Sequence, residues 1–196
     1  RGHLVKTRAR HNDIRYNLLY DGPLGEASYE LDLPNGGVAF VIGNIIGQSV
    51  NTQNPIVVAY GAEGQFWPEN ALYLAHNTLL SDRLTGTWFL RTFSERLPPD
   101  TEILGINNLT VGIGAFTLAA SGTFRGNVPL PPGGLRDPGT LDFRPQGTSL
   151  LRWITEPAGS VGDISLVPDA EFALPLGTRP LPPGHSWLPG ALQSGD

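Results

Sequence analysis

The sequence predicts an all-β fold built as a parallel β-helix, a solenoid in which each coil stacks on the next. One phrase recurs four times: two apolar residues, one or two short residues, an Asn, and a second apolar run. The four copies, at residues 14–19, 41–46, 74–80 and 104–109, place Asn17, Asn44, Asn77 and Asn107 at intervals of 27, 33 and 30 residues. A repeat of this length indicates stacked units, because one unit cannot bury its apolar face alone. Abundant Gly (25) and Pro (18) also favour strands and turns over helices.

Each Asn phrase follows a strand candidate bounded by Gly, Pro, Asn or Asp. The candidates are residues 4–9, 27–33, 55–60, 87–93 and 115–120. Short strands at this spacing fit one coil per repeat, so we expect about four to five coils. Residues 68–74 are the best helical candidate, but the apolar run at residues 73–80 reads better as a strand through the Asn phrase.

The recurrent Asn residues predict a ladder of turn residues. Asn tolerates the left-handed backbone conformation of a sharp turn, and stacked Asn amides can hydrogen-bond from coil to coil. Gly43 and Gly105 lie close to these turns, so we expect them to be turn residues as well. We therefore interpret the four Asn residues as structural.

The repeat fades after Gly114, and Pro and Gly become frequent at residues 129–134 and 180–184. Since Pro lacks a backbone donor, we expect extended chain wrapping the outside, with short elements at residues 148–153 and 169–174. The predicted division is β-helix coils at residues 1–126 and an irregular Pro/Gly-rich C-terminal cap of the same domain at residues 127–196. The expected anchors of the cap are Phe143, Trp153, Phe172 and Trp187.

Composition narrows the functional classes. A 40% hydrophobic and 16% charged chain with net charge −5 is neither disordered nor a basic nucleic-acid binder. No segment is long enough for an apolar membrane span, and no signal peptide is recognisable. Without Cys, neither disulfides nor a thiolate metal site is expected. Because Arg1 opens within a strand-like pattern, we expect missing upstream coils or a protein partner to cover the N-terminal coil.

A basic cluster lies in the first fifteen residues. Alternate residues of a strand share a face, so Lys6, Arg8 and Arg10 are predicted to form one outward row. This row would suit an acidic glycan, or it pairs with acidic side chains of neighbouring segments as an ordinary charged face. The expected acidic partners are Asp13, Glu26, Glu30 and Asp32.

Two longer loops, residues 51–55 and 61–70, leave the coils. Loops on one side of a solenoid commonly build its binding face, and Trp67 in the second loop is a candidate platform for a sugar ring. The alternative is that Trp67 folds down over the flank of the coil. The predicted carbohydrate-binding residues are Arg10, Tyr60, Glu63 and Trp67.

The remaining groups of polar residues give weaker indications of a catalytic or metal-binding site. Glu30 and Asp32, two apart on one strand, would suit inverting glycoside hydrolysis or Ca²⁺ binding, although paired surface acids more often do neither. His76 and Asp82 have no Ser or Cys nucleophile motif near them. No phosphate loop, HExxH motif or zinc spacing occurs, so no cofactor is expected beyond that Ca²⁺ alternative.

Several stretches resemble bacterial right-handed parallel β-helix proteins of the pectate-lyase-like superfamily. They are residues 2–9, 27–37 and 59–64, and the end of the chain at residues 141–149 and 189–192 is similar to the last coil and tail of such proteins. The resemblance covers nearly the whole chain. It implies a right-handed β-helix in a secreted bacterial protein, located outside the cell or in the periplasm.

Residues 6–17 resemble the segment around the catalytic Lys of lyases such as chondroitinase B and alginate lyases. In β-elimination a base removes the proton α to a uronate carboxylate, and a cation or metal neutralises that carboxylate. The resemblance makes Lys6 the base, with Arg8, Glu30 and Asp32 as the other catalytic candidates in the groove. The lyases carry an Arg-His pair where this chain has Glu30 and Asp32, whose carboxylates would repel a uronate.

The leading expectation is therefore a catalytically degenerate scaffold or carbohydrate-contacting module of a longer protein or larger surface assembly. The alternative is an active polysaccharide lyase, or a hydrolase, that acts on an acidic polysaccharide. Nucleic acid is not an expected partner, and no membrane span is expected.

Overall fold

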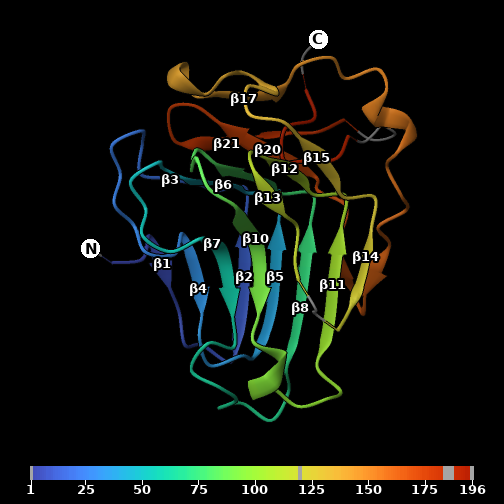
Figure 1. Cartoon of the computed structure of the whole chain (residues 1–196). Coiled ribbons are helices and arrows are strands. Elements are labelled where there is room, and N and C mark those ends of the chain that lie inside the picture. The colour runs from blue at the N-terminus through green and yellow to red at the C-terminus, as the bar shows by residue number, and fades with distance from the viewer. Residues whose placement is uncertain (1, 119–120, 183–187, 195–196) are drawn as a thin grey trace.

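The computed structural model describes residues 2–118, 121–182 and 188–194 of the chain, and its strands stack as a β-solenoid (Figure 1). Within these residues, three parallel sheets of five strands each run the length of the solenoid. Every coil contributes one strand to each sheet, so neighbouring strands of a sheet are one coil apart in the sequence. The prediction of an all-β solenoid of parallel coils is confirmed.

The first sheet, here sheet A, contains the strand that opens each coil. Its members are β1 (Val5–Lys6), β4 (Leu31–Leu33), β7 (Ile56–Tyr60), β10 (Thr87–Thr92) and β13 (Gly114–Ala115). The first four lie within the predicted strands. The fifth prediction, residues 115–120, overlaps β13 at one residue, and residues 119–120 lie outside the described part of the chain.

The other two sheets flank the Asn phrases. Sheet B comprises β2 (His11–Arg15), β5 (Val38–Ile42), β8 (Ala71–Ala75), β11 (Glu102–Ile106) and β14 (Thr123–Arg125). Sheet C comprises β3 (Leu18–Tyr20), β6 (Ile45–Gln48), β9 (Thr78–Ser81), β12 (Leu109–Val111) and β15 (Val128–Leu130). In each coil only two residues separate the sheet B strand from the sheet C strand. Strand β8 confirms the strand reading of the segment around Tyr73.

An Asn ladder joins the coils at this two-residue turn. The backbone N–H and the Nδ2 group of each Asn donate to Oδ1 of the Asn in the next coil, at 2.9–3.0 Å. The rungs in order are Asn17, Asn44, Asn77, Asn108 and Asn127. The ladder therefore satisfies buried turn amides along the whole solenoid.

The turn differs from the prediction in one respect. The left-handed residue is not the ladder Asn but the residue before it: Tyr16, Gly43, His76, Asn107 and Gly126 have φ between 52° and 65°. The fourth rung is therefore Asn108, and Asn107 occupies the left-handed position. Gly105 lies inside β11, where a Cβ would come within 2.8 Å of Phe116 and Phe124, so it is needed for close packing instead of a turn.

Three apolar clusters hold the molecule together. The largest fills the solenoid interior, with fully buried residues of the second, third and fourth coils such as Leu31, Val58, Leu72 and Leu90. The other two lie on the outer faces of sheets C and B, where the tail covers them. The outer residues of sheet C include Ile45, Leu80, Leu109 and Val128, and those of sheet B include Phe40, Ile42, Tyr73 and Ile106.

The tail after β15 lies along the side of the solenoid, above sheet C in Figure 1. Its elements are β16 (Leu135–Asp137), η2 (Pro138–Thr140), β17 (Asp142–Pro145), η3 (Leu151–Trp153), β18 (Ser160–Val161), β19 (Ile164–Ser165), β20 (Ala170–Ala173) and β21 (Gly177–Pro180). The segments expected at residues 148–153 and 169–174 match η3 and β20.

Two of the four expected tail anchors pack on the solenoid. Phe143 is 1% exposed and lies edge-on to Tyr20, and Phe172 packs beside it in the same cluster. The prediction for Trp153 is wrong, because it is 88% exposed in a 3₁₀ turn. Trp187 lies outside the described residues.

Candidate functional site

The predicted basic row lies on β1 and the segment that follows it, and acidic side chains pair with all three members. Lys6 Nζ lies 3.0 Å from Asp32 and 2.8 Å from Glu63, and Arg8 donates to both oxygens of Glu63. Arg10 contacts Glu69 at 3.2 Å. Asp32 was an expected partner, whereas Glu63 and Glu69 come from the loop of residues 61–70, two coils further along.

These ion pairs determine the protonation states of Glu63 and Lys6. Hydrogen bonds from Arg8 and Lys6 lower the pKa of the Glu63 carboxyl to about 2. The same contacts with Glu63 and Asp32 raise the pKa of Lys6 above its usual 10.5. Lys6 is therefore a protonated ammonium at neutral pH, which is the wrong state for a general base.

Glu30 and Asp32 are both buried, but only Asp32 has a cationic partner. It lies directly before β4, its backbone N–H bonds Val57, and its side chain has no exposed surface. Both carboxylate oxygens lack a partner among the described residues, and burial raises the pKa of the carboxyl to about 8. A ligand on the surface cannot touch Glu30, so its place among the catalytic candidates is corrected.

Tyr60 is the second predicted site residue that the surface does not present. It is fully buried in the solenoid interior, and its hydroxyl donates to the Gly37 carbonyl at 2.6 Å. Alternation along β7 turns Val58 and Tyr60 to the same inner side, and their partners in β4 are Leu31 and Leu33. The assignment of Tyr60 to a carbohydrate site is therefore corrected to a core position.

Trp67 was expected either to stand out as a platform for a sugar ring or to fold over the flank of the coil, and its position has features of both. Its indole N–H donates to the Arg8 carbonyl at 3.1 Å, so the ring folds against the coil and stays partly exposed. Phe66 stands edge-on to it, with ring centroids 4.9 Å apart, and is 70% exposed. The exposed aromatic face of this loop is therefore Phe66, which the sequence reasoning placed in the loop without assigning it a role.

A second group of aromatic and basic residues lies further along the outer face of sheet A. Lys6, Asp32, Ala59 and Arg91 align across β1, β4, β7 and β10. The Arg91 guanidinium lies 4.8 Å from the Trp88 ring centroid and 5.0 Å from that of Phe93. Sequence reasoning missed this pair, although Trp88 and Arg91 are three residues apart in a predicted strand.

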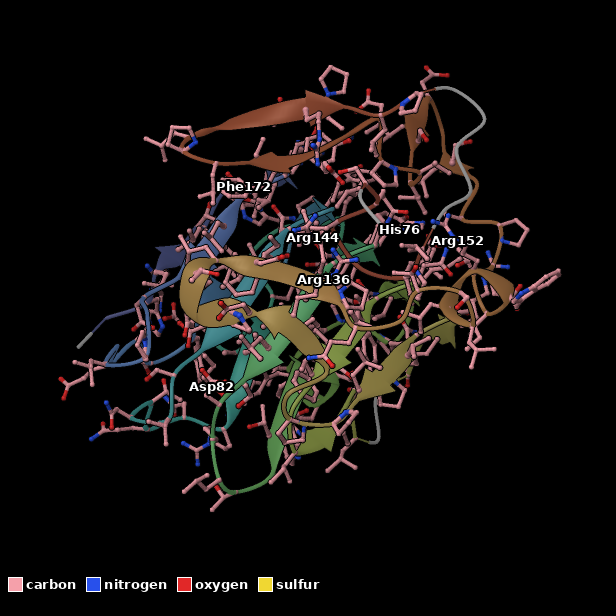
Figure 2. The ribbon with its side chains drawn as sticks, turned by 90° about the horizontal axis from the view of Figure 1, so that it is seen from above. His76, Asp82, Arg136, Arg144, Arg152 and Phe172 are labelled. Atoms are coloured by element: carbon pink, nitrogen blue, oxygen red, sulfur yellow. The ribbon has the colours of Figure 1, made fainter. Side chains whose placement is uncertain are left out.

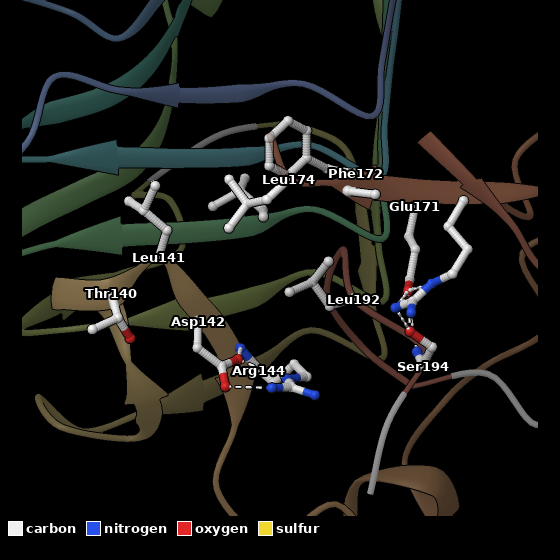
Figure 3. Close-up of a pocket in the computed structure, with 12 residues that line it drawn as sticks. Thr140, Leu141, Asp142, Arg144, Glu171, Phe172, Leu174, Leu192 and Ser194 are labelled. Atoms are coloured by element: carbon white, nitrogen blue, oxygen red, sulfur yellow. Dashed lines mark hydrogen bonds and ion pairs between the residues drawn. The ribbon is translucent and has the colours of Figure 1, made fainter. Parts of the chain in front are cut away.

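The tail forms a separate cleft of about 410 Å³ between its hairpins and sheet C (Figure 3). Arg144 pairs with Asp142 on one side, and Arg179 pairs with Glu171 on the other. Burial acts to raise the pKa of Glu171, but hydrogen bonds from the Ser194 hydroxyl, the Gln193 N–H, Arg179 and the Ser194 N–H outweigh it, so the pKa of this carboxyl is lowered. The Glu171 carboxylate therefore holds Gln193 and Ser194, near the end of the tail, against β20 and β21.

His76 lies beneath the tail, and Figure 2 shows it on the same side of the molecule as Arg144 and Phe172. The ring is 1% exposed, with Nδ1 3.1 Å from the Leu188 carbonyl and Nε2 3.1 Å from Asn107 Nδ2. Burial lowers its pKa to about 4. A neutral ring that donates from Nδ1 and accepts at Nε2 satisfies both contacts, so His76 has a structural role.

Within the described residues, no three His, Asp or Glu side chains are grouped so that they could hold a metal ion. The same part of the chain has no helix long and apolar enough to cross a membrane. Searches against protein-family models, curated proteins and solved structures find no match to this chain. The fold shows that this chain is a parallel β-solenoid. Because a fold alone does not determine function, any functional proposal must rest on the residues of the site.

Proposed function

We propose that this chain is a non-catalytic β-solenoid module that contacts carbohydrate through the outer face of sheet A and the loop of residues 61–70. The observation that carries the proposal is the exposed Phe66 ring on the same loop that supplies Glu63 to Arg8 and Glu69 to Arg10. An aromatic face can cover the apolar side of a sugar ring, while guanidinium and carboxylate groups bond its hydroxyls.

The charge balance of this face favours a neutral sugar. The three cations Lys6, Arg8 and Arg10 face the three carboxylates of Asp32, Glu63 and Glu69, so the row has no excess positive charge. An acidic glycan would have to displace Glu63 from Arg8 and Lys6. We therefore extend the proposal to a neutral polysaccharide met outside the bacterial cell, the location implied by the resemblance.

The test is binding of the folded chain to a panel of neutral and acidic polysaccharides, measured by calorimetry or on a glycan array. Phe66→Ala is expected to weaken binding about tenfold, which corresponds to the loss of one aromatic contact. Trp153→Ala is the matched control, because Trp153 is 88% exposed but belongs to the tail. Absence of binding to every glycan, or equal losses in both variants, would remove the carbohydrate role.

A further inference from the structure

The cleft between the tail and sheet C has a polar end and an apolar end. In Figure 3, Arg144 and Ser194 lie toward one end of the cleft, and Leu141, Phe172 and Leu174 lie toward the other. Its volume of about 410 Å³ is in the range of clefts that hold small molecules. None of its lining residues takes part in the carbohydrate contact proposed above, so any ligand of this cleft is a separate one.

Two arginines at the polar end each keep one terminal nitrogen for a ligand. Arg144 pairs with Asp142 through Nε and Nη2, at 2.7 and 2.5 Å. Arg179 donates from Nε and Nη2 to Glu171, and from Nη2 also to Ser194. Among the described residues, no acceptor reaches Nη1 of either arginine. The carboxylates therefore orient both guanidinium groups and leave their Nη1 donors to an external acceptor.

The accessible charge at this end is positive. The side chains of Arg144 and Arg179 are 36% and 59% exposed, whereas those of Asp142 and Glu171 are 24% and 0% exposed. The hydrogen bond from Arg144 lowers the pKa of Asp142, and the charge of Arg136 adds to this effect, so a third cation lies nearby. An anion entering the cleft would therefore meet more positive than negative charge.

The apolar end contains an unfavourable backbone position. Leu141 follows η2 with φ 64°, in the left-handed region that Gly or Asn occupies at less cost. It is 37% exposed, so burial in a core does not explain a large apolar residue here. Leu174, which lines the same cleft, is 54% exposed. A ligand with an apolar body that covers both side chains would explain why Leu stands at this strained position.

Sheet C supplies the floor of the cleft. Ile45 of β6 is 1% exposed, and Phe172 and Leu192 pack with it in one apolar cluster. Because such a packed cluster is rigid, the floor is formed before a ligand enters. An apolar floor with donors at one end gives a ligand a single favourable orientation.

We infer that this cleft binds an amphipathic monocarboxylate, a small molecule with one carboxylate and an alkyl body. The carboxylate accepts hydrogen bonds from Nη1 of Arg144 and of Arg179, because guanidinium groups match carboxylate geometry. The alkyl body lies over Ile45 and reaches Leu141 and Leu174. A sugar or a dicarboxylate is disfavoured, because it would place further polar groups against these leucines without hydrogen-bond partners.

The test is binding of octanoate to the folded full chain, measured by calorimetry. We expect a dissociation constant of about 1 mM or below. Octanol lacks the carboxylate and acetate lacks the alkyl body, so each should bind at least about tenfold more weakly. Nuclear Overhauser effects in the wild type should connect the methyl end of octanoate with the methyl groups of Leu141 and Leu174.

Two variants and one control separate binding from folding. Arg144→Gln removes one guanidinium and should weaken octanoate binding at least about tenfold. Arg125→Gln is the matched control, because Arg125 is an exposed arginine of β14 outside the cleft lining, and it should leave the affinity unchanged. Leu141→Asn suits the left-handed backbone but removes the apolar wall, so it should weaken binding without loss of stability.

Four results would overturn the inference. They are no measurable octanoate binding, equal affinities for octanoate and octanol, an affinity unchanged by both Arg144→Gln and Leu141→Asn, and Overhauser effects only to residues outside the cleft. If Leu141→Asn lowered stability and left binding intact, Leu141 would have a structural role alone, and the apolar end of the proposed site would be wrong.

Discussion

At the scale of single residues, charge pairing sets the chemistry of the outer face of sheet A. Lys6 and Arg8 share one carboxylate, Glu63, and Lys6 has a second in Asp32. A base for β-elimination must be neutral when it takes the proton, and each of these contacts stabilises the charged amine. Lys6 lies on the outer face, as alternation along the strand predicts, but its neighbours oppose the role of base that the resemblance to lyases implies.

The first prediction concerns this Lys. Folded protein incubated with alginate, pectate and glycosaminoglycans is expected to give no ultraviolet absorbance from unsaturated product. Lys6→Ala is expected to behave identically and to lose more than the about 1 kcal/mol of an exposed ion pair, because the Asp32 side chain is 2% exposed and would keep a buried carboxylate without this cation. An absorbance signal that disappears in Lys6→Ala would establish the lyase alternative instead.

The second prediction concerns Glu30. Its pKa rises from 4.5 to about 8 on folding, so between these values the native state holds a proton that the unfolded chain has lost. The free energy of unfolding should therefore fall as pH rises through this window, by up to about 1.4 kcal/mol per pH unit. Glu30→Gln keeps the shape of the side chain and should remove this slope in urea titrations.

The pH range of that measurement matters because His76 has the opposite effect. Its pKa falls from 6.5 to about 4 on folding, so it contributes stability above pH 6.5 that is lost as pH falls towards 4. Between pH 6.5 and 8 only Glu30 of this pair titrates. Equal slopes for the wild type and Glu30→Gln in that interval would show that the buried carboxyl is already ionised in the folded protein.

Alternation along strands located the outer row at Lys6, yet it could not show which side chains are covered. Glu30 and Asp32 are two residues apart and equally polar, but only Asp32 meets a cation. Tyr60 is as compatible with an exposed platform as with a core, and the neighbouring coils alone decide between them. Likewise, exposure separates Phe66 from Trp67, and exposure depends on where the loop folds.

At the scale of elements, the two-residue turn between sheets B and C organises the fold. Spacing alone found three of its five rungs, because the Asn phrase is well preserved at Asn17, Asn44 and Asn77. The Asn107-Asn108 pair offered two registers, and only the backbone geometry selects the second. The repeat does not predict Asn127, because no apolar pair precedes it and it follows Asn108 by only 19 residues.

The third prediction compares two rungs. Asn77→Ala should cost about 3 kcal/mol, because the side chain is fully buried and links Val41, Ala75 and Asn108 while accepting from Asn44. Asn17→Ala removes an exposed end rung and should cost about 1 kcal/mol or less. Chemical denaturation measures both. Equal losses would mean that the ladder contributes through turn conformation alone.

At the scale of the whole molecule, the tail covers the side of the solenoid, where the outer faces of sheets C and B are apolar. Its composition predicted chain wrapped around the coils, but the choice of face depends on the outward residues of the strands. Ile45, Leu109 and Val128 are as hydrophobic as the inner residues, so sheet C is buried on both faces. Such strands give no alternation, and a sequence reading cannot tell their two sides apart.

The last prediction tests this arrangement through Phe143. The ring is 1% exposed between β17 and sheet C, edge-on to Tyr20 at 5.6 Å, so Phe143→Ala should cost about 3–4 kcal/mol. Because this cluster is one of the two apolar contacts between the tail and the solenoid, limited proteolysis should then cut residues 131–182 before the coils. Trp153→Ala, on the same tail but exposed, should change stability by less than about 0.5 kcal/mol. If both variants were cut at the wild-type rate, the tail would be held by its apolar contact with sheet B and by the polar contacts of His76, Leu188 and Glu171, and the apolar face of sheet C would be secondary to them.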